Sequence, residues 1–239
     1  MIQLINYWKF SKTPLYSFLF TLPYFVFYEI GILFTSQDDL AVIRNGADAL
    51  MRQALSRFGI IGLYWLGGLF FIVFIISFIL QKKKWKESVI VGNYFFIMTL
   101  ESFFWSYVLF VLMSNMNILL MNPNGELLIQ QITLAIGAGI YEEFLFRVVL
   151  VFIMSSILTM IFKWSKNNVS IIAIIISAGI FSAFHFIGEF GDFFSFKIFM
   201  VRFLAGVFLG ILYLLRGFGI TAWSHSIYDL IILTKITME

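Results

Sequence analysis

Ionisable side chains interrupt the apolar stretches in the second half of the chain at three places. They are Glu142, Glu143 and Arg147, then His185, and then His225 with Asp229. A charge inside a membrane helix costs at least about 3 kcal/mol, so each of these groups needs a partner or a use. Carboxylates and imidazoles together can activate water, stabilise a developing negative charge or ligate a metal ion.

The first group combines an ion pair with a second carboxylate. Glu143 and Arg147 are four residues apart, so they share a helix face, and a glutamate placed N-terminal to an arginine pairs well. Glu142 is rotated by about 100° from Glu143. A carboxylate that faces an apolar cavity suits the general base that activates water. The alternative is a buried ion network that only fixes helix packing.

Each histidine has a neighbour at helical spacing. Phe181 lies one turn before His185, so its ring can pack against the imidazole and fix its orientation. His225 and Asp229 share a face, so the carboxylate can hold the imidazole tautomer, or both can point at one metal ion or one substrate oxygen. A satisfied interfacial histidine and a hydrogen-bonded helix–helix pair are the corresponding structural alternatives.

The series E-E-x-x-x-R, F-x-x-x-H and H-x-x-x-D, in this order on three apolar segments, resembles the CPBP family of intramembrane peptidases. That family includes type II CAAX prenyl endopeptidases and the Abi-like, bacteriocin-processing proteins. The resemblance covers about residues 127–235 and implies a helical core that cleaves peptides in a cavity within the membrane. Glu143 and Arg147 would support such a site.

The resemblance also implies roles for the other four residues. Glu142 and His185 would activate water, and His225 with the residue at position 229 would stabilise the oxyanion. The prenyl endopeptidases carry an asparagine where this chain has Asp229. An amide can donate a hydrogen bond to an oxyanion and an ionised carboxylate cannot. Asp229 would therefore be protonated, orient His225, or ligate a metal ion.

A metal ion is a second way to activate the water. Glu142, His185, His225 and Asp229 make a plausible Zn²⁺ set with one position left for water. The chain lacks the H-E-x-x-H pattern of zinc peptidases, and it has no cysteine. We therefore favour a glutamate-driven hydrolase with no cofactor, with zinc as the alternative.

The elements that carry these residues are expected to be membrane helices. Of the 239 residues, 61% are hydrophobic and 12% are charged, against roughly 25% charged residues in a soluble domain. We predict an all-α fold, a polytopic membrane helix bundle with seven or eight transmembrane helices, as a single domain over residues 1–239. The apolar stretches long enough to span a bilayer are 14–35, 58–80, 88–119, 127–162, 169–187, 194–215 and 218–235.

The basic residues fall in short clusters between these stretches, as in cytoplasmic loops, and they predict no nucleic-acid partner. Seven spans place all these clusters, and Arg216, on one side. The stretch 14–35 is too long for a cleaved signal peptide and is expected to remain as the first span. The overlong stretch 127–162 is either one tilted helix or a helix broken near Gly137 and Gly139.

Other polar segments have simpler interpretations. Residues 37–58 predict an amphipathic helix at the membrane interface, or alternatively a lid or a substrate-docking element. Glu101 is expected in an ion pair with another helix, Arg202 lies in an apolar stretch without a motif, and Asp192 is expected to be solvated in a turn.

The predicted site residues differ in depth. At ~1.5 Å per residue, Glu142 lies roughly 30 Å from Lys163, and His185 comes out at a similar depth on the following helix. His225 lies only about 12 Å from Arg216. Groups that act on one peptide bond must meet, so the helices must tilt strongly or the fourth must extend beyond the membrane.

We therefore predict an intramembrane endopeptidase that hydrolyses a peptide bond in a membrane-associated protein or peptide. The expected location is the lipid bilayer of a bacterial plasma membrane, as a multi-pass protein. One alternative is a non-catalytic immunity or scaffold protein of the same fold. The other is a proton-coupled transporter, since buried acids and histidines also mark ion pathways; transporters usually contain internal repeats, and this sequence has none. Substrate and oligomeric state stay open.

Overall fold

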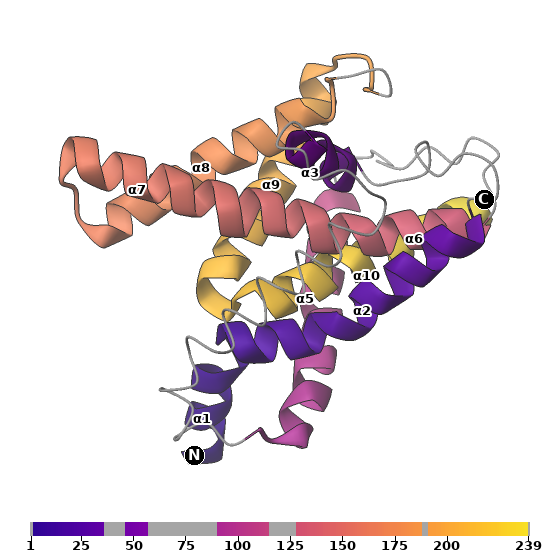
Figure 1. Cartoon of the computed structure of the whole chain (residues 1–239), viewed down its shortest axis with the longest axis horizontal. Coiled ribbons are helices and arrows are strands. Elements are labelled where there is room, and N and C mark those ends of the chain that lie inside the picture. The colour runs from indigo at the N-terminus through magenta and orange to yellow at the C-terminus, as the bar shows by residue number, and fades with distance from the viewer. Residues whose placement is uncertain (1, 36–45, 57–89, 115–127, 188–190, 239) are drawn as a thin grey trace.

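The computed structural model describes residues 2–35, 46–56, 90–114, 128–187 and 191–238, and within these ranges the chain is helical with short turns and contains no strand (Figure 1). The α-helices are α1 (Ile2–Ser11), α2 (Pro14–Thr35), α3 (Gly46–Ser56), α5 (Gly92–Ser114), α6 (Leu128–Gly137), α7 (Val151–Phe162), α8 (Lys166–Phe184), α9 (Phe196–Arg216) and α10 (Phe218–Met238). The predicted all-α fold is confirmed over these residues.

Five helical stretches among the described residues are long and apolar enough to cross a membrane. They are Pro14–Ile32, Gly92–Ser114, Leu128–Phe162, Lys166–Phe184 and Phe196–Arg216. The predicted span 58–80 lies outside the described residues. The predicted span 218–235 is part of α10, which is helical but is not one of the five. The protein is therefore an integral membrane protein, and the count of seven or eight spans stays a prediction.

The overlong stretch is a single helix of 35 residues, Leu128–Phe162, and not a broken pair. Its middle is π-helical, in two segments named η2 (Ala138–Glu142) and η3 (Phe144–Leu150). A π-helix has wider turns, closed by hydrogen bonds over five residues, and is found mostly as short insertions at functional sites. The two predicted catalytic glutamates lie in this wide part of the helix.

Gly139 does not break the long helix but lies in its contact with α10. A Cβ at this position would collide with the Ser226 side chain and the Ala222 backbone oxygen. Ser226 Oγ also donates to the Ile136 oxygen at 3.2 Å. The glycine therefore permits close contact between two helices.

The helix α10 is the central element of the bundle. It packs against α2, α5, α6, η2 and α9. In Figure 1, α6 and α7 lie in line across the view, whereas α5 runs steeply to them. The α8 and α9 helices pack against each other, and α8 returns along α7.

A second buried polar group, which we call the arginine clamp, consists of Arg216, Glu101, Tyr7, Ser11 and Trp105. Arg216 is fully buried and donates from Nε and Nη2 to the Glu101 carboxylate, and from Nη2 to Ser11 Oγ at 2.8 Å. Tyr7 Oη and Trp105 Nε1 donate to the same carboxylate. Burial, together with the hydrogen bond to Glu101, raises the pKa of Tyr7 well above its ordinary value, so the phenol stays a donor.

The clamp confirms the prediction for Glu101 and shows where the Arg216 side chain lies. Glu101 forms the expected ion pair with another helix, because Arg216 ends α9. The side of the membrane on which Arg216 lies stays a prediction. The clamp holds its guanidinium inside the bundle, whereas the lysines of the basic clusters, such as Lys163, are exposed.

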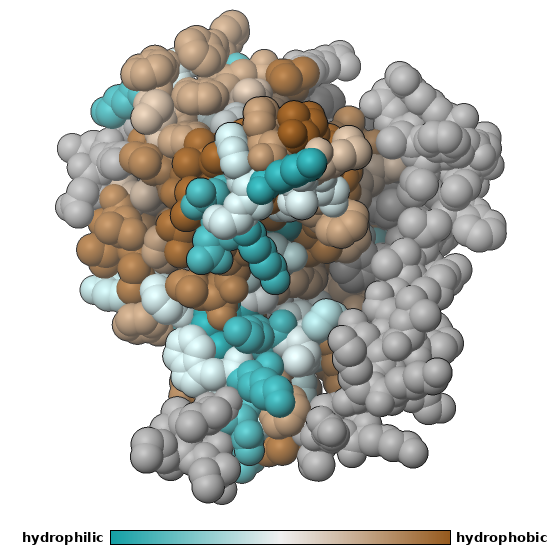
Figure 2. Space-filling view, turned by 90° about the vertical axis from the view of Figure 1, so that its left-hand side faces the viewer, coloured by the Kyte–Doolittle hydropathy of each residue, from teal (hydrophilic) through white to brown (hydrophobic). Residues whose placement is uncertain are grey.

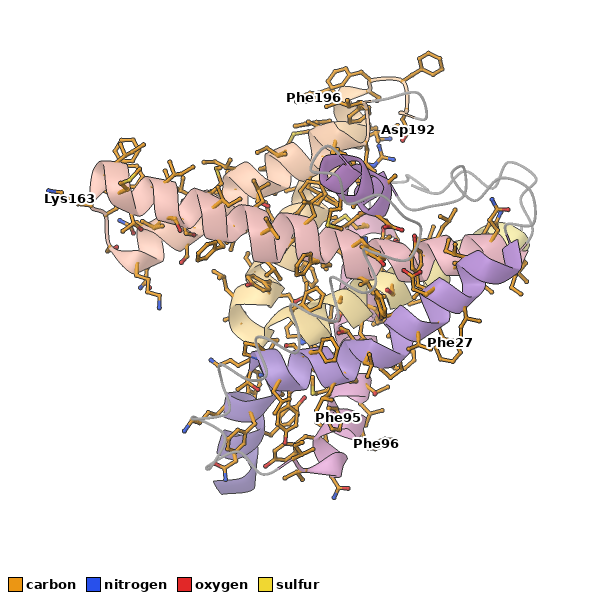
Figure 3. The ribbon with its side chains drawn as sticks, viewed as in Figure 1. Phe27, Phe95, Phe96, Lys163, Asp192 and Phe196 are labelled. Atoms are coloured by element: carbon orange, nitrogen blue, oxygen red, sulfur yellow. The ribbon has the colours of Figure 1, made fainter. Side chains whose placement is uncertain are left out.

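The surface separates into polar and apolar parts. Lys9, Lys12, Lys163 and Lys166 are exposed, and the α7–α8 turn with Lys163 lies at one end of the molecule (Figure 3). Figure 2 shows this side, where hydrophilic residues gather in the middle of an apolar surface. Elsewhere large apolar side chains point outward, as Phe27 does at 63% exposure (Figure 3). This pattern fits contact with lipid.

The helix α3 lies within the predicted amphipathic segment 37–58, whose other residues fall outside the described part of the chain. It packs against η2. Asp48 is buried and accepts a hydrogen bond from Tyr28 Oη at 2.8 Å. Its position at a membrane interface and its alternative role as a lid stay predictions.

Candidate active site

The three groups of predicted site residues meet at one cavity. The cavity has a volume of about 160 Å³, and Glu142, His185, His225 and Asp229 are among its lining residues. Glu142 comes from η2, His185 follows the last residue of α8, and the other two come from α10. The groups therefore meet although residue counting along each helix placed His225 at a different depth.

Glu143 and Arg147 lie behind the cavity and form the predicted ion pair. Glu143 Oε2 is 3.0 Å from Arg147 Nε, and both side chains are almost completely buried. Glu143 Oε1 accepts a hydrogen bond from His225 Nδ1 at 2.7 Å. Arg147 also donates to the Gly206 oxygen of α9 at 3.4 Å. One carboxylate thus connects the π-helical segment to α10, and its arginine reaches α9.

Glu143 sets the tautomer of His225. The carboxylate can only accept, so the hydrogen on Nδ1 belongs to His225. Asp229 lies on the other side of the ring, with Oδ2 at 3.6 Å from Nε2. Holding the tautomer was one of the alternatives for Asp229, and in the structure Glu143 is the carboxylate that accepts from Nδ1. The reason is that η2 and α10 pack closely at Gly139, which brings Glu143 within hydrogen-bond distance.

His185 is fixed by the last turn of α8. Its Nδ1 donates to the Phe181 backbone oxygen at 2.9 Å, so Nε2 carries the lone pair in the neutral ring. This nitrogen faces Glu142, with Nε2 at 3.9 Å from Oε2. Two atoms at that separation can both hydrogen-bond to one water molecule at about 2.8 Å each. The pair can therefore hold and activate a water molecule.

Phe181 connects the parts of the site. As the sequence predicted, its ring packs against His185, edge to face at 4.9 Å between centroids. The same ring lies 6.3 Å from the His225 ring and 4.4 Å from the Arg147 guanidinium carbon. Contact with this one aromatic ring therefore orients both imidazoles. The next residue, Ser182, donates to the Phe199 oxygen of α9 at 2.7 Å and so joins α8 to α9.

Two polar residues that the sequence analysis did not assign to the site also line the cavity, namely Arg202 and Tyr228. Asp192 is half exposed, as expected for a solvated residue, and it also pairs with Arg202. Arg202 could have been predicted as a site residue, because it is a cation in an apolar stretch. Nothing in the sequence marks Tyr228, because a tyrosine beside Asp229 is typical of ordinary packing.

The residues predicted as metal ligands line the same cavity, but their ligand atoms are not close enough together to bind one metal ion. Within the described residues, no three histidine, aspartate or glutamate side chains approach one another closely enough to hold a metal ion. His225 directs Nδ1 to Glu143, which leaves only Nε2 toward the cavity. A zinc site at Glu142, His185 and Asp229 with this nitrogen would require their side chains to move together. It stays an alternative.

Comparison with known proteins identifies the part of the chain that carries the site. Residues 124–231 match the family described as type II CAAX prenyl endopeptidase Rce1-like. No curated protein and no solved structure gives a significant match. The matched residues include all six predicted site residues, and the family is a protease family, which supports a peptidase. Residues 124–231 are therefore similar to the Rce1-like type II CAAX prenyl endopeptidases, the likeness that the three motifs predicted.

Proposed function

We propose that this protein is an intramembrane endopeptidase that hydrolyses a peptide bond in a membrane-associated protein or peptide. The observation that carries the proposal is the convergence of Glu142, His185 and His225 from three helices on one cavity. The cavity is otherwise lined mainly by apolar side chains such as Leu109 and Leu209. Such a lining suits an apolar peptide segment, and the polar groups supply the chemistry.

Glu142 is the general base in this proposal. It takes one proton from a water molecule held between its carboxylate and His185 Nε2, which lie 3.9 Å apart. The water oxygen forms a bond to the carbonyl carbon of the substrate. The intermediate then breaks its carbon–nitrogen bond, and Glu142 passes its proton to the leaving nitrogen. The products are a carboxylic acid and an amine, so atoms and charge balance.

His225 and Asp229 stabilise the oxyanion in this proposal. His225 Nδ1 is held by Glu143, so Nε2 can donate when the ring is an imidazolium, with Glu143 as its counter-charge. Asp229 can donate only in its protonated form. Donors fixed in place before the reaction are the largest single source of catalysis in many acyl-transfer sites.

The proposal is tested with purified protein in lipid nanodiscs and a pooled peptide library, with cleavage followed by mass spectrometry. Glu142→Gln, His185→Ala and His225→Ala are each expected to reduce cleavage by at least about 100-fold. The matched control is Asp48→Asn, which changes another buried carboxylate that does not line the cavity. Cleavage by the control is expected to stay near that of the wild type.

The same experiment separates the alternatives. Cleavage that survives a chelator supports the glutamate-driven reaction, and cleavage that a chelator abolishes supports a metal ion held by the cavity residues. A Glu142→Gln variant that cleaves at the rate of the wild type contradicts the assigned mechanism. If His185→Ala and His225→Ala also keep the cellular phenotype of the protein, a scaffold or immunity role replaces the enzyme.

A further inference from the structure

Arg202 is a buried cation on the wall of the cavity. Only 7% of the residue is exposed, and it is the sole lysine or arginine among the described residues that line the cavity. Its Nη2 contacts the Asp192 carboxylate, which is half exposed, at the start of α9 (Figure 3). Its guanidinium carbon lies 5.4 Å from the centre of the Phe186 ring. Stacking and pairing therefore fix one edge of the guanidinium.

The other edge of the guanidinium has no use in the proposed mechanism. Arg202 Nη1 is buried and has no hydrogen-bond partner among the described residues. An unsatisfied buried donor costs about 1–3 kcal/mol, more when it is charged. Arg147 and Arg216 each have such an Nη1 as well, but neither of them lines the cavity. Arg202 is therefore the arginine whose unused donor can meet a bound substrate.

The cavity is lined by acidic groups and by one arginine. Glu142 and Asp229 line it together with the two histidines, and Arg202 is its permanent cation within the described part of the chain. A negative group on a bound peptide is repelled by the Glu142 carboxylate and attracted by the guanidinium. Tyr228 Oη is a second buried cavity-lining donor without a partner among the described residues. These features distinguish the Arg202 wall as the place for an acceptor.

We propose that Arg202 is a specificity-determining residue that binds a carboxylate of the substrate at the wall of the cavity. This inference rests on the proposed peptidase function. A guanidinium binds carboxylates through its planar fork of N–H donors, and Asp192 occupies one edge of that fork. The carboxylate comes from the end of the peptide chain or from an acidic side chain. In either case Asp192 competes with it for the same cation.

The test uses a pooled library of apolar peptides, each made as a free acid and as a C-terminal amide. Selected members also carry Asp against Asn, or Glu against Gln, at each position. Full-length wild type, Arg202→Gln, Arg202→Lys and Asp192→Asn in nanodiscs are compared by the ratio of acid to amide cleavage. This ratio is internal to each sample, so a loss of folded protein does not change it.

We expect the wild type to prefer the carboxylate form by about 10- to 100-fold, the range for a hydrogen bond to a charged group. Arg202→Gln should bring the ratio close to one, and Arg202→Lys should give an intermediate value. Asp192→Asn should raise the ratio, because the competing carboxylate is removed. Equal ratios in the wild type and Arg202→Gln would overturn the proposal. A preference within the acid and amide pairs shows that Arg202 binds the C-terminal carboxylate. A preference for Asp over Asn, or for Glu over Gln, shows that it binds an acidic side chain.

Binding separates this inference from the proposed function. The same library is incubated with Glu142→Gln protein, and the retained peptides are identified by mass spectrometry. Enrichment of carboxylate forms that disappears in the Glu142→Gln/Arg202→Gln double variant supports Arg202 even if the wild type cleaves nothing, and the peptidase proposal then fails alone. Retention of both forms in equal amounts contradicts the role of Arg202, whatever the protein cleaves.

Discussion

Two buried arginine–glutamate pairs in this protein have the same chemistry and different surroundings. In the arginine clamp, the Glu101 carboxylate accepts from Arg216, Tyr7 and Trp105. In the site, the Glu143 carboxylate is shared between Arg147 and His225, and His225 lines a cavity. The first network ends in packed side chains. The second ends at the cavity.

The difference teaches that a buried charge in a membrane helix is not by itself a sign of function. Both pairs satisfy the rule that such charges are partnered. Only the pair at Glu143 and Arg147 also orients a cavity-lining side chain, the imidazole of His225. The clamp instead joins α1, α5 and α9, which lie far apart in the sequence. We therefore expect the two networks to respond to substitution in opposite ways.

The largest expected effect is on turnover at the cavity. Glu142→Gln should lower the cleavage rate by about 10²- to 10⁴-fold, the usual contribution of a general base. Its unfolding midpoint should stay near that of the wild type, because the amide has the same shape. Cleavage assays and thermal unfolding in nanodiscs measure the two quantities. A variant that unfolds at a lower temperature and still cleaves at the wild-type rate would show that Glu142 has a structural role, like Glu101 in the clamp.

The next effect is on the clamp. Glu101→Gln should lower the free energy of unfolding by about 3–5 kcal/mol, because it leaves the Arg216 charge buried without a counter-charge. Turnover per folded molecule should not change. The double variant Glu101→Gln/Arg216→Met should recover much of the loss in a denaturant titration. Equal losses in the single and double variants would show that the pair itself is not the stabilising unit.

Glu143 sharpens the comparison, since it belongs to an ion pair and also positions a site residue. Glu143→Gln should reduce turnover by about 10- to 100-fold, as the loss of an orienting partner does at comparable sites. It should also lower stability, because Arg147 loses its counter-charge. Glu143→Ala should reduce turnover further, since it removes the acceptor for His225 Nδ1. Turnover that is equal in the two variants would contradict the positioning role.

The smallest effect concerns two glycines. Gly139→Ala should cost about 1–3 kcal/mol of stability and some turnover, since its Cβ would push α10 away from η2. A Cβ at Gly179 would meet nothing within 4 Å, so Gly179→Ala should raise stability by about 0.5–1 kcal/mol. Parallel denaturant titrations compare the pair. A stabilising Gly139→Ala would refute the close-contact explanation.

Local spacing was enough to predict the parts of the site that lie on single helices. The pair of Glu143 with Arg147 and the packing of Phe181 on His185 both follow from residues four apart. The boundaries of the long apolar helix were also close to 127–162, because hydropathy decides which residues leave water.

The remaining features depend on contacts between distant parts of the chain. Arg216 lies 115 residues from Glu101, so no local pattern indicates that it is buried. The link between Glu143 and His225 spans 82 residues and requires the approach at Gly139. Depth along a helix could not be predicted from counting residues, since a long helix can cross its neighbours at any tilt. The roles of the site residues stay predictions for the cleavage assay.

The π-helical segments η2 (Ala138–Glu142) and η3 (Phe144–Leu150) have a consequence for how this protein can vary. Each wide turn shifts the angular phase of the residues on either side. Losing one residue there would restore regular turns and rotate α6 against α7 by about 100°. Every side chain of α6 would then meet a different neighbour on α10. The length of this segment is therefore expected to be less tolerant of change than the identity of its lipid-facing residues.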